Sequence, residues 1–434
     1  MKKLIMLATA SVLALVASGA TAQTELRVWD TFTEVSEGMD AMVAAFEAAN
    51  PDIDVVRDVQ SVDDMRAIIQ TALNSGTGPD VVYYDTGPGF AGVLAKAGLL
   101  RPLDDFYASG ALDAVYPWTK ERSTFGGKVY GVGNQLEFVA VYYNADLFAK
   151  LGLNAPTTYE EFLTVSEALK AAGVVPVAFG NAAGWPAFHN FSLYANNFVP
   201  QDKLEAMIAG TESWEAPEVV AAIQAMFVDM NAAGYLNPSV NAVAYDDANI
   251  LFSSGMAGMT MTGSWMIRGF KDTTFRTNSF FLPAPAGGTT LPPAGLGSGY
   301  FITSASVNVE AAERFLTFLY DPANASYWVE QMSVIPPYDV DTSSLEVSPL
   351  LAQTMKALST MQMGYNIDVL TPEAFNTTML DGFQAVLAGD RTAAEQPALL
   401  DTLTGPWRPA SRQPVPQPCG RPQELPGTRP ASRC

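Results

Sequence analysis

The segment GGKVYGVGNQLEFVAVYYNADLFAK, residues 126–150, carries the pattern that decides the fold prediction. It begins with a Gly-Gly pair, a turn signal, and its run at 138–143 is rich in β-branched and aromatic residues, as buried strands are. Asn144 can cap a helix that follows. Glu137 stands at the start of the apolar run, where a carboxylate is costly unless it meets a partner or a ligand. The segment therefore predicts a turn, a buried strand and a helix, and leaves Glu137 open as either a structural or a ligand-binding acid.

Before this segment, short apolar runs alternate with amphipathic stretches. Strands are expected at 24–29, 53–59 and 80–85, with helices between them. This alternation predicts an α/β unit with a largely parallel sheet. Because ligands of such sheets bind beyond the carboxyl ends of the strands, polar and aromatic residues at or just after those ends are candidate ligand contacts. They are Trp29, Asp30, Thr33, Tyr84 and Asp85.

After this segment, aromatic residues again follow expected strands. The expected strand at 174–179 leads to Trp185, and the one at 256–262 leads to Trp265. An aromatic ring can cover the apolar face of a sugar, while carboxylates and amides can bind its hydroxyls. Each aromatic residue alone is more often part of a core, but their recurrence beside acids and amides indicates a binding site. The aromatic candidates in this half of the chain are Trp185, Trp265, Tyr300 and Tyr338.

Composition disfavours several classes of function. The formal net charge is −21, so the protein is not expected to bind nucleic acid, which needs clustered Lys and Arg. The sequence contains no motif for a metal or a cofactor, and none is expected. A glycosidase needs two carboxylates facing a glycosidic bond, and the many acids of the chain leave that alternative open. The single histidine, His189, is expected to pack or to form a hydrogen bond rather than to act in catalysis.

The two ends of the chain differ from its body. Residues 1–22 combine a basic start, an apolar run and an Ala-Thr-Ala site, which predicts a signal peptide cleaved near Ala22 and a periplasmic protein. Residues 405–434 are rich in Pro and Arg and hold both cysteines, Cys419 and Cys434. Such a segment cannot bury a core, so it is expected to be disordered, and we interpret it as a frameshifted or artefactual end.

The run YYNADLFAK at 142–150 resembles the most recognisable motif of the extracellular solute-binding proteins that serve carbohydrate ABC transporters, the maltose-binding-protein type. Supporting motifs are GPDVV at 78–82, GMAGM at 255–259 and PAPAG at 283–287, and the resemblance covers nearly all of 23–404. It implies a two-lobe, type II α/β fold. Each lobe is then a mostly parallel sheet flanked by helices, with the ligand cleft between the lobes.

The resemblance also implies boundaries and roles. The first lobe is expected to comprise 23–131 with 286–320, and the second 132–285 with 321–404. Ligand-binding roles fall most directly on Glu137, Trp185, Trp265 and the loop after Trp29, and less directly on Asp85, Gly297, Gly299 and Tyr300. The implied protein is a monomer that captures a mono- or oligosaccharide, closes about a hinge without catalysis and delivers the sugar to the permease subunits of an ABC importer. The alternatives are a protein that binds another neutral polyol and a secreted glycoside-acting enzyme.

Overall fold

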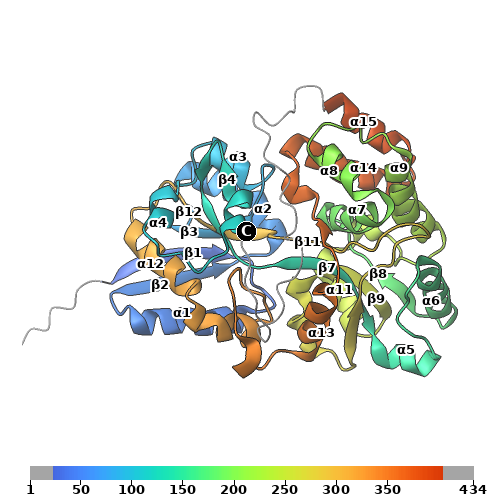
Figure 1. Ribbon diagram of the computed structural model, residues 1–434, viewed down its shortest axis with the longest axis horizontal. Coiled ribbons are helices and arrows are strands. Elements are labelled where there is room, and N and C mark those ends of the chain that lie inside the picture. Colours follow the sequence, from blue (N-terminus) through green and yellow to red (C-terminus); the bar gives the residue numbers. More distant parts are fainter. Residues whose placement is uncertain (1–22, 404–434) are drawn as a thin grey trace, which may run out of the picture.

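The computed structural model describes residues 23–403, which form two α/β lobes lying side by side (Figure 1). Each lobe has its own sheet and its own hydrophobic cores. The two-lobe α/β fold expected from the sequence is therefore confirmed. The predicted signal peptide, with its cleavage near Ala22, and the predicted disordered tail at 405–434 lie outside the described residues.

The first sheet consists of β1 (Thr24–Asp30), β2 (Ile53–Val59), β3 (Val81–Asp85), β6 (Gly131–Gly133) and β12 (Ser298–Ile302). Its strand order is β2-β1-β3-β12-β6. β1 pairs in parallel with β2 and β3, whereas β12 is antiparallel to β3 and β6. Helices cover both faces, so neighbouring side chains of one strand enter different cores: Val28 packs on one side and Trp29 on the other.

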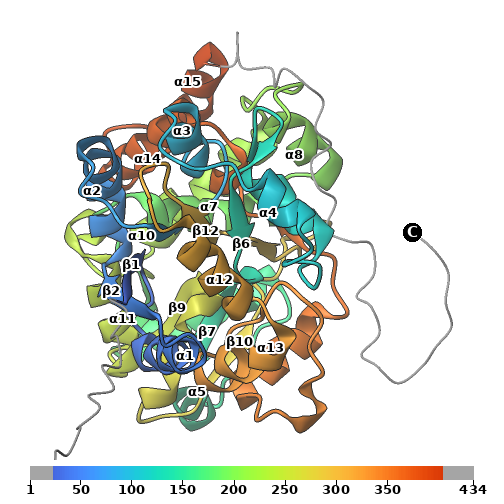
Figure 2. The ribbon, with the colours of Figure 1, turned by 90° about the vertical axis from the view of Figure 1, so that its left-hand side faces the viewer.

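The helices of the first lobe are α1 (Ser36–Ala49), α2 (Val62–Ser75), α3 (Ala91–Lys96), α4 (Asp104–Ala108) and α12 (Val309–Leu319). α1 and α12 share one core on one face of the sheet, and α2 and α3 share the core on the other (Figure 2). Ser61 caps α2 by accepting a hydrogen bond from the Asp64 amide. The first turn of α2 is thereby held just beyond the end of β2.

The second sheet has the order β13-β11-β7-β9-β8, and β10 also pairs with β7. Its strands are β7 (Glu137–Asn144), β8 (Val175–Ala178), β9 (Ala257–Gly263), β10 (Thr277–Phe280), β11 (Pro293–Gly295) and β13 (Gly364–Tyr365). β7 is buried along its whole length, as its apolar run predicts. Val141 faces one core of this lobe and Tyr142 faces the other. Asn144 caps the next helix by accepting from the Leu147 amide at 2.9 Å.

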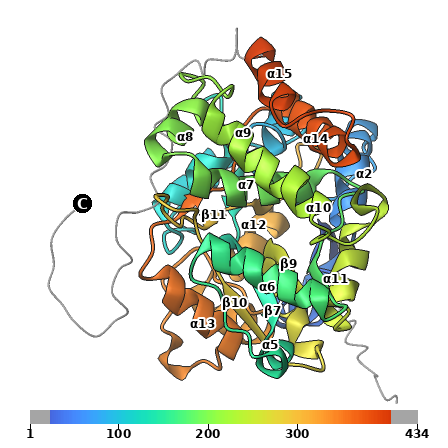
Figure 3. The ribbon, with the colours of Figure 1, turned by 90° about the vertical axis from the view of Figure 1, so that its right-hand side faces the viewer.

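The helices of the second lobe are α5 (Ala145–Leu151), α6 (Tyr159–Ala171), α7 (Trp185–Phe198), α8 (Gln201–Ile208), α9 (Pro217–Ile223), α10 (Met230–Ala232), α11 (Tyr245–Ser253), α13 (Pro349–Leu358), α14 (Glu373–Ala388) and α15 (Glu395–Leu403). α14 and α15 lie together at one end of this lobe and α5 at the other (Figure 3). The Gly-Gly turn at 126–127 joins the two-stranded hairpin of β4 (Thr124–Phe125) and β5 (Lys128–Val129), and both glycines have positive φ.

In each described sheet one strand runs against all the others: β12 in the first and β7 in the second. Each of these strands is entered directly from the other lobe, β7 after β6 and β12 after β11. Both sheets are otherwise parallel, in agreement with the expected mostly parallel sheets. The two reversed strands therefore mark the first two of the three places where the described chain crosses between lobes, and the third crossing comes before α13 of the second lobe.

The crossings differ from the expected lobe boundaries. β6 belongs to the first sheet, so the first crossing follows residue 133 rather than 131. β11 pairs within the second sheet, which moves the second crossing from 285 to 296–297. Trp328 and Val334 pack in a core of the first lobe, so that lobe continues past residue 320. The turn at 283–287, which resembled a lobe exit in the sequence, leads to one more strand of the second lobe.

Candidate functional site

A cavity of about 140 Å³ lies between the lobes. Its volume is about ten times the smallest that holds one water molecule, which is enough for a small solute. The first lobe contributes residues of the loop after β1, the first turn of α2 and the end of β3. The second lobe contributes the starts of α7 and α11 and the loop after β13. The crossing strands lie between these two sets and complete the wall.

Glu137, the first residue of β7, forms part of this wall and is only 7% exposed. Gln135 donates a hydrogen bond from Nε2 to Glu137 Oε1 at 2.7 Å. Burial raises the pKa of Glu137 to about 7. A Cβ at Gly297 would lie 1.8 Å from Glu137 Oε2, so only glycine lets the crossing chain approach this carboxylate. The acid singled out in the sequence is thus held at the junction of the lobes.

Aromatic rings form the second-lobe side of the cavity. Trp265 follows β9 and donates from Nε1 to the Tyr245 hydroxyl at 2.7 Å. The ring centroids of Trp185 and Tyr245 are 4.5 Å apart. His189 lies one turn after Trp185 on α7, with its ring 5.1 Å from Trp185 and 5.5 Å from Trp265. We call these four residues, Trp185, His189, Tyr245 and Trp265, the aromatic wall.

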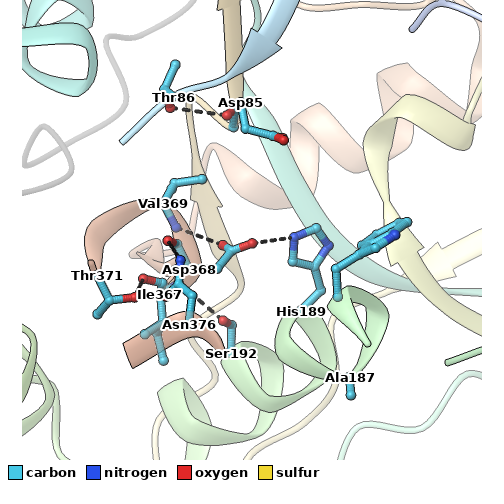
Figure 4. Close-up of polar contacts among 12 residues, drawn as sticks. Asp85, Thr86, Ala187, His189, Ser192, Ile367, Asp368, Val369, Thr371 and Asn376 are labelled. Carbon is cyan, nitrogen blue, oxygen red and sulfur yellow. Dashed lines mark hydrogen bonds and ion pairs between the residues drawn. The ribbon is translucent and has the colours of Figure 1, made fainter. Parts of the chain in front are cut away.

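Charged groups lie opposite and beside the aromatic wall. Arg66 on α2 pairs with Asp85 at 2.8 Å. His189 contacts Asp368 at 3.1 Å, and the Val369 amide also donates to Asp368 (Figure 4). Burial alone would raise the pKa of Asp368, but His189 and then Arg66 outweigh it and hold this pKa below its ordinary value. The carboxylate of Asp368 therefore stays ionised inside the cavity wall.

One hydrogen bond across the cavity joins the two lobes. Trp185 donates from Nε1 to Asp63 Oδ1 at 2.8 Å, and Asp63 lies in the first turn of α2. The guanidinium of Arg66 is 5.4 Å from the centre of the Trp185 ring. Trp185 is consequently held between an acid and a cation of the opposite lobe, which fixes its ring as a boundary of the cavity.

The structure brings half of the sequence-predicted site residues together at the cavity. Those that line it are Thr33, Asp85, Glu137, Trp185, Trp265 and Gly297. Those that do not line it are Trp29, Asp30, Tyr84, Gly299, Tyr300 and Tyr338.

The six residues away from the cavity have other environments. Trp29 and Tyr84 pack against the α2 side of the first sheet, while Tyr300 and Tyr338 are buried on its other side. Helices cover both faces of this sheet, so most aromatic residues of its strands pack into a core, whereas Tyr83 of β3 both packs in a core and lines the cavity. Asp30 is fully buried and pairs with Arg57, with 2.5 Å between Oδ2 and Nε.

Gly299 also has a structural role. A Cβ at this position in β12 would lie 2.6 Å from the carbonyl oxygen of Val132. The close pairing of β12 with β6 therefore accounts for this glycine without a ligand.

Sequence reasoning missed several residues of the cavity. Asp63 and Arg66 could have been predicted as site residues, because the first turn of a helix that follows a parallel strand lies at the ligand-binding edge of the sheet. Tyr245 and Asp246 begin α11, and they had no such signal. The segment around Asp368 reaches the cavity from a distant part of the sequence.

Within residues 23–403, no group of three or more His, Cys, Asp or Glu side chains is arranged to hold a metal ion. Over the same part of the chain, no helix combines the length and apolarity that crossing a membrane requires.

The chain forms two α/β lobes and crosses between them, and the lobes enclose a polar cavity with an aromatic wall. This architecture defines a two-lobe binding protein. The chain belongs to the family described as bacterial extracellular solute-binding protein, whose sequence profile matches residues 29–326. Members of this family bind solutes and are not enzymes, which settles the class of protein and places its site of action outside the cytoplasm.

Individual relatives are distant but cover most of the chain. An uncharacterized ABC transporter extracellular-binding protein of Pyrococcus horikoshii is 25% identical over 373 residues, 82% of each chain. The multiple sugar-binding protein of Streptococcus mutans is 24% identical over 327 residues, 72% of this chain and 73% of that protein. The solved structure of a chitin oligosaccharide binding protein has a TM-score of 0.79 and 23% identity, covering 88% of this chain and 98% of the other.

Proposed function

We propose that this protein captures a sugar in the periplasm and delivers it to the permease subunits of an ABC importer. The observation that carries the proposal is the aromatic wall, which faces ionised and amide side chains across the cavity between the lobes. Aromatic rings can cover the apolar face of a sugar while the polar groups bind its hydroxyls. The names of the relatives from Pyrococcus horikoshii and Streptococcus mutans support the transporter and the sugar, respectively.

The proposed ligand contacts come from both lobes. Thr33, Asp85, Glu137, Trp185 and Trp265 remain candidates, and Gly297 gives the ligand and Glu137 room at the crossing. A second cavity of about 190 Å³ adjoins the first and shares four lining residues with it: Asp63, Arg66, Trp185 and Asp368. This adjoining space supports a ligand with more than one ring.

We further propose that the lobes close on the ligand about the crossing strands. Three contacts between lobes are of the kind that closure forms. Trp185 donates to Asp63, the Arg268 side chain donates to the Gln331 carbonyl at 2.8 Å, and the backbone of Gly87 approaches that of Val369. We expect the protein to act as a monomer, without a cofactor and without binding nucleic acid.

A thermal-shift screen against mono- and oligosaccharides tests the proposal. A sugar present at 100 times its dissociation constant should stabilise the protein by about 2.7 kcal/mol. Chromatography should then recover the sugar unaltered. If no sugar or polyol in the screen shifts the melting temperature, the proposal that this binding protein carries a sugar is wrong.

A further inference from the structure

The cavity contains more acids than cations. Its lining includes six carboxylates: Glu34, Asp63, Asp85, Glu137, Asp246 and Asp368. The described lining residues that can carry positive charge are Arg66 and His189, and each is already engaged, Arg66 with Asp85 and His189 with Asp368. Four lining carboxylates are therefore left without an ion-pair partner among the described residues.

Three of these four acids meet where the lobes face one another. Glu34 and Asp63 come from the first lobe, Asp246 comes from the second, and all three are exposed at the edge of the cavity. We call them the rim acids. Partial desolvation by the surrounding protein raises the pKa of Glu34, and the neighbouring charge of Asp246 raises it further. Desolvation likewise raises the pKa of Asp246, and the charge of Asp63 adds to this effect. The lobes therefore approach each other with like charges face to face, which opposes closure.

Two residues that line the same cavity hold buried side-chain acceptors without a hydrogen-bond partner. Gln135 and Asn366 line it and are 4% and 6% exposed, and the side-chain oxygens Gln135 Oε1 and Asn366 Oδ1 have no hydrogen-bond partner. The Nε2 group of Gln135 is occupied by Glu137, so its carbonyl oxygen is the atom that remains. A carbonyl oxygen can only accept, so any partner of these two oxygens must be a donor.

We propose that the ligand is an amino sugar whose protonated amine lies among Glu34, Asp63 and Asp246. This inference rests on the proposed sugar-binding function. A neutral hydroxyl both donates and accepts, whereas an ammonium only donates, which matches a cavity whose free groups are acceptors. An ammonium between the rim acids would also convert their mutual repulsion into attraction as the lobes close.

Calorimetry with matched sugars tests the inference. D-glucosamine, D-galactosamine, D-mannosamine and the disaccharide of glucosamine are each compared with the neutral parent sugar and with the N-acetylated form. We expect at least one amine to bind about ten times more tightly than both of its uncharged counterparts. Because the rim acids are exposed, this preference should shrink when salt rises from about 0.01 M to about 1 M.

A pair of variants separates the rim acids from the overall negative charge. Asp246→Asn should reduce the preference for the amine over its neutral parent about tenfold. Asp247→Asn removes the same charge from the next position of α11, which does not line the cavity, and should leave the preference unchanged. A melt of each unliganded variant verifies that it is folded.

Two results overturn the inference in different ways. If neutral sugars bind at least as tightly as their amines, or if both variants behave alike, the ligand is not selected by the rim acids, and the sugar-binding function still stands. If neither charged nor neutral sugars bind, the proposed function fails and this inference fails with it.

Discussion

Substitution of Gly89 by alanine should weaken ligand binding without touching the ligand. Gly89 lies in the loop between β3 and α3 and faces a loop of the second lobe. A Cβ at this position would lie 2.7 Å from Asn376 Nδ2 and 2.9 Å from the Thr371 carbonyl oxygen, where ordinary contacts begin at 3.4 Å. Asn376 cannot turn away easily, because it donates to the Asp368 carbonyl and accepts from Thr371. The lobes must therefore separate slightly to make room for the methyl group.

The size of the effect follows from the cost of overpacking. Extra methyl groups in a packed interface cost about 1–3 kcal/mol. If only the closed form has this contact, the whole cost appears in ligand binding, and affinity falls by about 5- to 150-fold. The unliganded protein should melt within a few degrees of wild type, because its lobes can open. Calorimetry with the ligand identified by screening, together with a melt of the unliganded variant, measures both quantities.

A matched control is available at the same interface. Gly269 lies in the second lobe and faces Glu34 of the first, but the nearest atom to a Cβ there would be 3.7 Å away. Gly269→Ala should therefore bind ligand as wild type does. Wild-type affinity in Gly89→Ala would refute the reasoning that these loops must meet on closure. An equal loss of stability in the unliganded variant would show that the loops stay together without ligand.

Three further predictions concern single side chains. Trp265→Ala removes part of the aromatic wall, so it should weaken sugar binding by about 2 kcal/mol with only a small change in melting temperature. A large loss of stability with unchanged affinity would instead show that Trp265 is a core residue. Glu137 keeps its proton in the folded protein up to about pH 7, whereas the same side chain in the unfolded chain loses its proton near pH 4.5. The protonated carboxyl therefore contributes its full stability below about pH 4.5, and this contribution is lost as the pH rises through 7. The melting temperature of Glu137→Gln should consequently fall less between about pH 5 and about pH 8 than that of wild type, and equal slopes would contradict the raised pKa. Asp30→Ala removes the buried partner of Arg57 and leaves the exposed Asp40 as its ion-pair partner, which should cost about 1–3 kcal/mol of stability in chemical denaturation while the folded protein binds sugar normally; a loss of affinity without a loss of stability would return Asp30 to the ligand site.

Much of the fold could be predicted from local patterns. The apolar run after Glu137 is a buried central strand, Asn144 caps the helix after it, and the Gly-Gly turn at 126–127 closes a hairpin. These features depend on neighbours within a few residues, so the sequence carries their signal directly. The lobe boundaries were less accurate, because β11 and the segment around Trp328 owe their lobe to pairing and packing with distant residues.

The sequence by itself determined the order of strands and helices, the division of the chain into two lobes and the acids and aromatic residues that follow strands. The tertiary structure decided which of those residues face the cavity. Asp30 and Asp85 both end strands of the same sheet, yet Asp30 is buried against Arg57, while Asp85 pairs with Arg66 at the cavity. Their local sequences do not separate them, because the environment of a side chain at a strand end depends on which helix and which lobe pack against that end. Those partners come from distant parts of the chain, and only folding brings them together.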